Sequence, residues 1–188
     1  MKKIVLLGDS IRQIGYGLKV PQLLGEGYEV WQPDDNCRYS IYTLRGMHDW
    51  RANLEGSDVI HWNNGLWDNC DILGDGIRFT PIDRYVEVMC RIASILKGYS
   101  KHVIFATTTP VLDGLGRNDN ETTRAYNAAV VPALEAMGIE INDLYSAVEA
   151  NMDAWIKKSD LVHLTEEGID GCAAIVADKI RAACERLG

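Results

Sequence analysis

Short apolar runs alternate along the chain with longer segments in which apolar residues recur at the spacing of a helix. The runs with strand character are residues 3–8, 28–32, 58–63, 102–107 and 139–142. Each is apolar at nearly every position, which is typical of strands buried on both faces of a parallel sheet. The pattern therefore predicts a parallel sheet with helices on both sides.

The helical segments differ in the strength of their pattern. They are residues 12–24, 43–54, 82–97, 120–137 and 166–187. In residues 82–97 the apolar side chains share one face and Pro81 stands at the helix start, which favours a regular helix. Gly15, Gly17 and Pro21 interrupt the first segment, so a continuous helix is not expected there. Pro132 predicts a kink or a break in the fourth segment.

The length and composition fit one soluble domain. The chain has 188 residues, of which 47% are hydrophobic and 24% charged, close to the average of globular proteins. It contains no repeat, low-complexity tract or linker. We therefore expect residues 1–188 to form a single α/β domain, a three-layer α/β/α sandwich, in which ligands bind outside the carboxyl ends of the strands.

The charge argues against nucleic acid as a partner. Asp and Glu number 27 against 19 Lys and Arg, which gives a net charge of −8, and no cluster of Lys and Arg offers the phosphate contacts that nucleic-acid binding needs. The longest aliphatic runs, such as residues 4–7, are far shorter than the roughly 20 residues of a membrane-spanning helix. We expect a cytoplasmic protein with no membrane partner, because the run after Met1 is also too short for a signal peptide.

Neither a metal site nor a disulfide framework is expected. The five cysteines are odd in number and form no CxxC pair, and the four histidines show no ligand spacing. Zinc sites and disulfide frameworks have recognisable spacings that are absent here. The pattern favours reduced thiols and predicts no cofactor.

Two segments carry groups suited to nucleophilic catalysis. Ser10 follows the first strand in Gly8-Asp9-Ser10, where a serine serves either as a helix cap or as a nucleophile with a base nearby. His163 stands three residues after Asp160 and just before the last helix. A carboxylate in that position can accept the Nδ1–H of the imidazole and leave Nε2 to act as a base. Each segment taken alone also has an ordinary structural interpretation.

A third polar segment follows the middle strand. It reads His61-Trp62-Asn63-Asn64-Gly65-Leu66-Trp67-Asp68. Two amide side chains at the edge of a sheet are costly to bury without partners, which indicates a polar ligand. The alternative is a turn at the Asn-Gly pair.

The three segments, in this order along the chain, resemble the SGNH/GDSL hydrolase family, and the resemblance extends from Gly8 to Gly168. It implies a flavodoxin-like sheet of five parallel strands in the order 2-1-3-4-5, and a serine esterase acting on a small-molecule ester. By the same resemblance Ser10 would be the nucleophile, His163 the base and Asp160 the group that orients it. The reaction would pass through an acyl-enzyme.

The family's oxyanion segments are altered in this sequence. Trp67 stands where the family pattern GxND has its Asn, so we expect Asn63 or Asn64 to supply the side-chain amide, with Asn63 preferred. No glycine occurs at residues 35–40, so the backbone N–H of Cys37 or Arg38 would be the second donor. The N–H of Ser10 completes the predicted oxyanion hole.

Several side chains near the predicted cleft suggest the substrate. Arg12, Trp62 and Trp67 fall in the loops at the carboxyl edge, where guanidinium and aromatic groups suit a sugar, although the Trp side chains could simply pack the walls. No extended apolar run offers room for a long acyl chain, so we expect a short acyl group, preferably acetyl. Residues 112–120 form either a lid or a connection.

Two other functions compete with the esterase. One is a ligand-binding protein of the same fold in which the altered oxyanion segments have abolished turnover. The other is a nucleotide or flavin binder, which the acidic Gly8-Asp9-Ser10 turn and the absence of a glycine-rich phosphate loop disfavour.

Overall fold

A single five-stranded sheet forms the middle layer of the molecule. The computed structural model describes residues 1–188. The strands are β1 (Lys2–Leu7), β2 (Tyr28–Trp31), β3 (Ser57–Trp62), β4 (Ser100–Ala106) and β5 (Glu140–Asn142). All are parallel and lie in the order β2-β1-β3-β4-β5. The predicted sheet and its strand order are confirmed, with strand bounds that differ by one or two residues.

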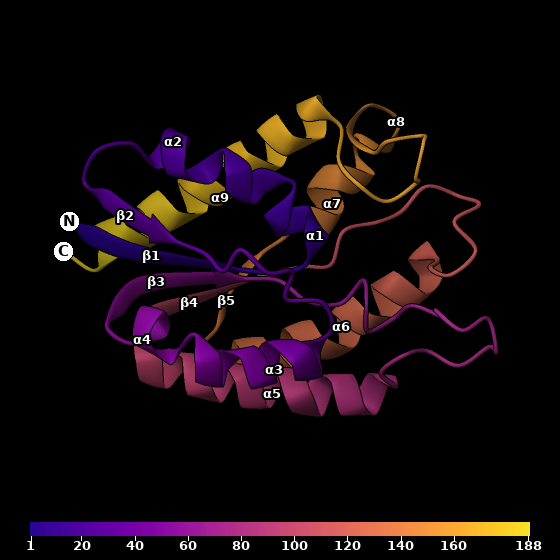
Figure 1. The fold of residues 1–188 in the computed structure, drawn as a ribbon, viewed down its shortest axis with the longest axis horizontal. Helices are drawn as coiled ribbons and strands as arrows, with labels where there is room; N and C mark the ends of the chain where they lie inside the picture. The colour runs from indigo at the N-terminus through magenta and orange to yellow at the C-terminus, as the bar shows by residue number, and fades with distance from the viewer.

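Helices cover both faces of the sheet (Figure 1). On one face lie α1 (Ser10–Gln13), the short 3₁₀ helix η1 (Tyr16–Leu18), α2 (Val20–Leu24), α7 (Leu144–Glu149), α8 (Met152–Trp155) and α9 (Glu166–Arg186). On the other lie α3 (Ser40–Asp49), α4 (Arg51–Leu54), α5 (Ile82–Tyr99) and α6 (Asn120–Ala136). The predicted three-layer sandwich is therefore present.

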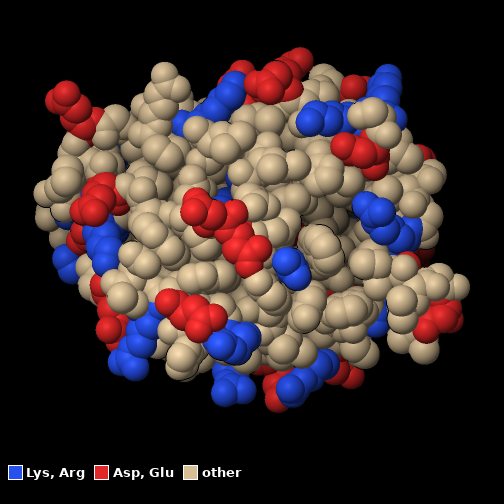
Figure 2. Space-filling view, in the orientation of Figure 1, with Lys and Arg blue, Asp and Glu red and all other residues tan.

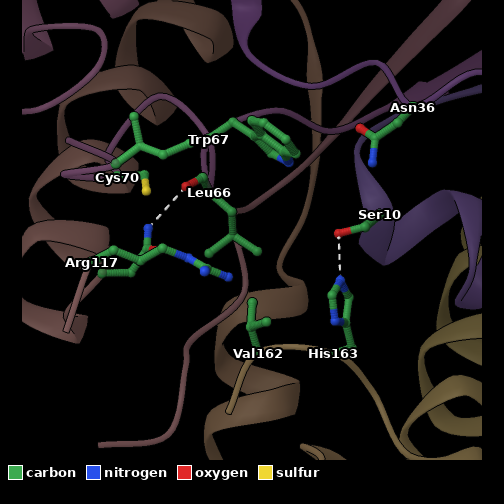
Figure 3. A pocket seen from close by; sticks show the side chains of 10 residues that line it. Ser10, Asn36, Leu66, Trp67, Cys70, Arg117, Val162 and His163 are labelled. Carbon is green, nitrogen blue, oxygen red and sulfur yellow. Dashed lines mark hydrogen bonds between the residues drawn. The ribbon is translucent and has the colours of Figure 1, made fainter. Parts of the chain in front are cut away.

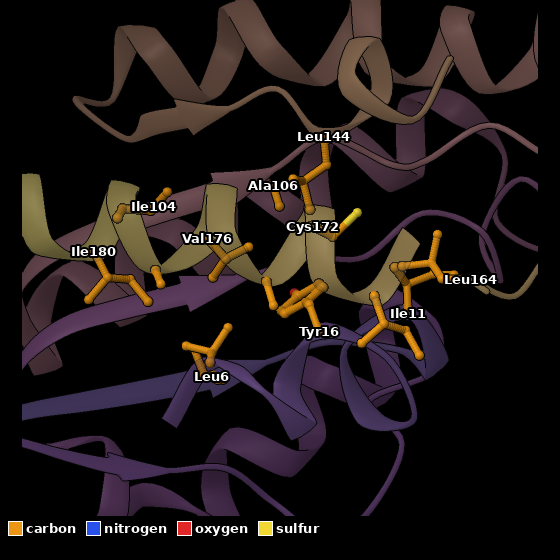
Figure 4. Packing of buried hydrophobic residues seen from close by; sticks show 14 of the residues in the cluster. Leu6, Ile11, Tyr16, Ile104, Ala106, Leu144, Leu164, Cys172, Val176 and Ile180 are labelled. Atoms are coloured by element: carbon orange, nitrogen blue, oxygen red, sulfur yellow. The ribbon is translucent and has the colours of Figure 1, made fainter. Parts of the chain in front are cut away.

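Alternate residues of the central strands enter two separate hydrophobic clusters. Ile4 and Leu6 of β1 pack into the cluster that contains the inner face of α9 (Figure 4). Val5 and Leu7, which point to the opposite face, pack into the cluster that contains the inner face of α5. Because successive side chains of a strand point to opposite faces, both sides of β1 must be apolar. This double burial explains the continuous apolar runs in the sequence.

The helices differ from the sequence prediction at three places. Residues 12–24 divide into α1, η1 and α2, in keeping with the interrupting Gly and Pro residues. The segment expected at 43–54 begins earlier, at Ser40, and divides at Trp50 into α3 and α4. Pro132 lies inside α6, which continues to Ala136. The expected break at Pro132 is therefore absent.

Two helices were not predicted. These are α7 and α8, which connect β5 to the loop that contains Asp160 and His163. They span only six and four residues, too few for a helical period to stand out. Asp143 caps α7 by accepting a hydrogen bond from Ser146 N at 3.1 Å. These helices set the distance between the last strand and the functional loop.

The surface carries charged side chains of both signs. Acidic and basic side chains are mixed over the face shown in Figure 2. None of the helices combines the length and the apolar character needed to cross a membrane. The five cysteines are unpaired, and no group of His, Cys, Asp and Glu side chains has the arrangement of a metal site.

Candidate active site

Ser10 begins α1, directly after the turn that ends β1. The helix cap at this turn is Asp9, whose Oδ1 accepts a hydrogen bond from Ile11 N at 2.9 Å. Ser10 is therefore not needed as the cap. Its own N–H has no partner within the chain, as is usual for the first residues of a helix. Both polar groups of Ser10 are thus free to act at the pocket that it lines.

A tight loop before α9 presents His163 to Ser10. Ile156 and Leu164 form an antiparallel bridge, and Lys157 N donates to His163 O at 2.8 Å. Leu161 adopts a positive φ of 65° inside this loop. The imidazole Nε2 lies 2.9 Å from Ser10 Oγ (Figure 3). The backbone of the loop therefore fixes where the ring lies.

Asp160 orients the imidazole from behind. Its Oδ2 lies 3.2 Å from His163 Nδ1, while its Oδ1 accepts the N–H groups of Val162 at 3.0 Å and His163 at 2.8 Å. Burial alone would raise the pKa of Asp160, but these hydrogen bonds outweigh it and lower the pKa below the usual value. The ionised carboxylate accepts the Nδ1–H, so Nε2 is left to accept the proton of Ser10.

Asn63 lies at the carboxyl end of β3, beside the Ser10 turn, and is 5% exposed. Its Oδ1 accepts a hydrogen bond from the hydroxyl of Tyr16 at 2.9 Å, which fixes the orientation of the amide. A Cβ on Gly8 would lie 1.9 Å from this Oδ1, so only glycine lets Asn63 come so close to the turn. Nδ2 is therefore left as the donor end of the side chain.

Asp9 neighbours this amide. Burial raises the pKa of Asp9, and the Asn63 side chain, the Ile11 N–H and the Arg12 charge offset only part of that effect. The two hydrogens on Asn63 Nδ2 allow it to contact Asp9 and still donate one hydrogen bond to a ligand.

Three of the predicted oxyanion donors already form hydrogen bonds within the fold. Asn64 accepts a hydrogen bond from Trp62 Nε1 at 2.9 Å and donates to Arg38 O at 2.8 Å. The N–H of Arg38 donates to Asn36 Oδ1 at 2.7 Å, and that of Cys37 donates to Gly8 O at 3.0 Å. A backbone N–H has a single hydrogen, so Cys37 and Arg38 would have to weaken these bonds in order to bind an oxyanion. The structure gives Asn64 and Arg38 these other partners, and their part in an oxyanion hole stays a prediction.

Asn36 is the polar residue that sequence reasoning missed. It lines the pocket with Ser10 and His163. Because Oδ1 accepts the Arg38 N–H, Nδ2 is its free end, and Figure 3 shows this nitrogen on the Ser10 side of the pocket. The sequence indicated the right segment, residues 35–40, but the backbone was expected to supply the donor there.

Arg12 and Trp62 do not line the pocket. The Arg12 guanidinium is 1% exposed and donates to the carbonyl oxygens of Gly8, Pro33 and Asp35 at 3.0, 2.8 and 2.7 Å. Trp62 is fully buried and packs against Phe105 with ring centroids 4.9 Å apart. Arg12 holds the loop after β2 against the Ser10 turn, and Trp62 belongs to the core. Both predictions of substrate contact are wrong.

The pocket at the carboxyl edge has a volume of about 310 Å³. Beside Ser10, Asn36 and His163 it is lined by Leu66, Trp67, Cys70, Ile72, Arg117, Asn118 and Val162 (Figure 3). Trp67 thus lines the pocket, and its contact with a substrate stays a prediction.

The segment 112–120 contributes Arg117 and Asn118 to this pocket. Leu112 N donates to Leu161 O at 2.8 Å, and Val111 N donates to Asn120 Oδ1 at 2.9 Å. The first bond ties the start of the segment to the loop that holds His163, and the second joins the two ends of the segment to each other.

In sequence, the chain is similar to two curated plant proteins. It is 31% identical to the GDSL esterase/lipase WDL1 of Oryza sativa subsp. japonica, over 87% of this chain and 72% of the relative. It is 25% identical to the GDSL esterase/lipase CPRD49 of Arabidopsis thaliana, over 95% of this chain and 77% of the relative. No family model matches the chain.

In structure, the fold is similar to that of solved proteins of much lower sequence identity. A lipase/acylhydrolase from Enterococcus faecalis superposes with a TM-score of 0.78 at 18% identity, covering 97% of this chain and 96% of that chain. An acetylxylan esterase from Geobacillus stearothermophilus gives a TM-score of 0.78 at 18% identity, covering 95% and 94%. At this identity the likeness concerns the fold.

Proposed function

This chain belongs to the GDSL esterase/lipase family of SGNH hydrolases, which makes it a carboxylic ester hydrolase, and from that premise we propose that it is a serine esterase that removes a short acyl group, preferably acetyl, from a carbohydrate or another small polar molecule. The observation that carries the proposal is the hydrogen-bonded chain from Asp160 through His163 to Ser10.

In the proposed reaction Ser10 is the nucleophile and His163 the general base. As Ser10 Oγ bonds to the ester carbonyl carbon, its proton moves to His163 Nε2, 2.9 Å away, and Asp160 stabilises the imidazolium. The C–O bond to the alcohol then breaks, and His163 returns the proton to the departing oxygen. Water, deprotonated by His163, attacks the acyl-enzyme, and Ser10 recovers its proton as the acid leaves.

We assign the oxyanion hole to the N–H of Ser10 and the amide of Asn63, with Asn36 as a further donor. Ser10 and Asn36 line the pocket with donors that have no partner in the chain, and Asn63 lies beside the Ser10 turn. The N–H groups of Cys37 and Arg38 donate within the chain, and Asn64 joins Trp62 to Arg38. Fixed donors that meet the developing negative charge contribute to catalysis because they need no rearrangement at the moment of reaction. Every proposed step uses groups of the chain and water.

The proposed acyl and alcohol groups rest on two supports. A structural relative with the same fold is an acetylxylan esterase. The pocket also combines an aromatic wall at Trp67 with the polar groups of Asn36 and Asn118, a mixture that suits a sugar ring. The cytoplasmic location expected from the sequence stays a prediction.

The activated serine is tested with a fluorophosphonate probe and 4-nitrophenyl acetate. Wild type should be labelled and should hydrolyse the ester, and Ser10→Ala should lose both. Ser94→Ala, a change at an exposed serine of α5, is the matched control and should behave as wild type. Equal labelling of wild type and Ser10→Ala would contradict the esterase mechanism and favour the ligand-binding alternative.

The acyl length is tested with a series of 4-nitrophenyl esters from acetate to octanoate. We expect kcat/KM to be highest for acetate and to decrease with chain length. Acetylated xylo-oligosaccharides, followed by release of acetate, then test the carbohydrate part. Faster turnover of octanoate than of acetate would overturn the short-acyl proposal and leave the serine mechanism intact.

A further inference from the structure

Arg117 brings an unpaired positive charge to the pocket. Its guanidinium makes neither a salt bridge nor a hydrogen bond within the chain, whereas the neighbouring Arg78 pairs with Asp119 at 2.7 Å. Arg91 is likewise unpaired but lies at a different surface hollow, on α5. Figure 3 shows the Arg117 guanidinium reaching between Leu66 and Val162 toward Ser10 and His163. Arg117 is therefore the free cation of the active site.

The backbone holds Arg117 in this position. Its carbonyl oxygen accepts a hydrogen bond from Asp71 N at 2.8 Å, and its N–H donates to Leu115 O at 2.9 Å. The next residue, Asn118, is 8% exposed and donates to Leu66 O at 2.9 Å and to Asn69 Oδ1 at 2.5 Å. The point from which the side chain departs is thus tied to both neighbouring connections.

The acidic residues nearby are engaged elsewhere. Asp71 accepts the N–H groups of Gly74 and Gly76 at 2.8 and 2.9 Å, and Asp119 caps α6 by accepting Thr122 N at 2.7 Å. The wall beside Arg117 is apolar, at Leu66, Ile72 and Val162. Arg117 is itself exposed, so its charge is accessible to an anion that enters the pocket.

We propose that Arg117 binds an anionic group of the substrate, so that the natural ester belongs to an acidic molecule with a carboxylate or a phosphate beside the acyl group. The proposal rests on the esterase function proposed above and narrows its substrate class. In a protein of net charge −8, the general field repels anions, so an anionic substrate requires a local cation. Arg117 supplies that cation at the wall opposite Ser10.

Turnover of three matched acetate esters tests the proposal. Methyl 4-acetoxybenzoate is the neutral ester, 4-acetoxybenzoate carries a carboxylate, and 4-acetoxyphenyl phosphate carries a phosphate. The readout is the ratio of kcat/KM for each anionic ester to that for the neutral one. Arg117→Gln should lower this ratio about tenfold, the size of one partly exposed charged hydrogen bond. Arg117→Lys should retain part of it, and Arg91→Gln should leave it as in wild type.

Binding without turnover provides the second readout. Calorimetry on Ser10→Ala should show tighter binding of 4-acetoxybenzoate than of its methyl ester, and the difference should disappear in Ser10→Ala/Arg117→Gln. In the turnover experiment, the anionic ester whose kcat/KM ratio falls further on Arg117→Gln identifies carboxylate or phosphate as the preferred anion. Equal binding of anionic and neutral ester by both variants would overturn the proposal, and this result does not depend on whether the wild type is an active esterase.

Discussion

On one wall of the pocket, Ser10 and His163 meet from two short segments, a strand-to-helix turn and a tight loop, whose backbones are hydrogen-bonded within themselves. On the other wall, Leu66, Ile72 and Arg117 come from the long connections between β3 and α5 and between β4 and α6. The first wall places reacting atoms within 3 Å of one another. The second wall shapes the pocket with apolar side chains and carries the positive charge of Arg117.

This difference indicates how changes to the two walls should act. Groups that meet only the transition state should alter kcat, whereas groups that hold the substrate throughout should alter KM. The following variants test this division, because a reacting-wall variant that raised KM at unchanged kcat would contradict it.

Asp160→Asn should produce the largest effect, a decrease in kcat of about 10,000-fold. Asn preserves the shape but no longer favours the imidazole tautomer that leaves Nε2 as the base.

The lowered pKa of Asp160 means that its carboxylate stays ionised until the pH falls below the usual 3.8. The acid limb of the pH profile in wild type should therefore not arise from Asp160. Stopped-flow or steady-state hydrolysis of 4-nitrophenyl acetate between pH 4 and 9 measures the kcat of Asp160→Asn and the acid limb of the wild-type profile.

The matched control is Asp113→Asn, at an exposed carboxylate in the connection after β4. It should leave kcat within a factor of two or so of wild type, because an exposed charge without a partner contributes little. Comparable losses in the two variants would show that Asp160 does not orient the base.

Asn63→Ala should lower kcat about 100- to 1,000-fold, the usual cost of one oxyanion donor. Asn64→Ala should instead lower the free energy of unfolding by about 1–3 kcal/mol, because it leaves Trp62 Nε1 unpaired in the interior and removes the donor to Arg38 O. Kinetics and urea unfolding of both variants separate the two roles. A greater loss of kcat in Asn64→Ala than in Asn63→Ala would reverse the assignment.

Tyr16→Phe should have the smallest effect, a decrease in kcat of about tenfold at nearly unchanged KM. The lost hydroxyl leaves Asn63 Oδ1 without its donor, so the orientation of the amide is no longer fixed. Tyr126→Phe is the control, since it removes a buried hydroxyl bonded to Thr80 O at 2.8 Å. If both variants lose stability alike and keep full kcat, Tyr16 has only a structural role.

The sheet and the reacting wall were predictable because physical constraints on them are local. A strand segment that is covered on both faces favours consecutive apolar residues, as at residues 4–7 of β1 and at Val59 and Ile60 of β3. The pairing of Ser10 with His163, 153 residues apart, followed from the resemblance to the family, whereas Asp160 and His163 are three residues apart and their spacing already reflects their geometry. The same holds for α5, whose apolar face spans many turns.

The oxyanion donors and the second wall were not predictable in this way. Whether an amide is free depends on partners far along the chain: Asn64 is bonded to Arg38, 26 residues away, whereas Asn36 keeps its Nδ2 free. Arg12 and Trp62 lie next to the functional segments in sequence yet point into the protein. The sequence does not distinguish Arg117 from Arg78, because only the fold determines that Arg78 pairs with Asp119 and that Arg117 has no ion pair.

The two chain ends meet at the edge of the sheet opposite the pocket. Lys2 Nζ donates to Gly188 O at 3.1 Å, and the termini lie side by side in Figure 1. A short peptide could therefore join them, and the chain could be reopened at the exposed turn around Leu73. Such a circular permutant would encode His163 before Ser10 while keeping both in place. The order of the catalytic segments in the sequence would then reflect only the descent of the chain. The reaction would require only that the segments meet in space.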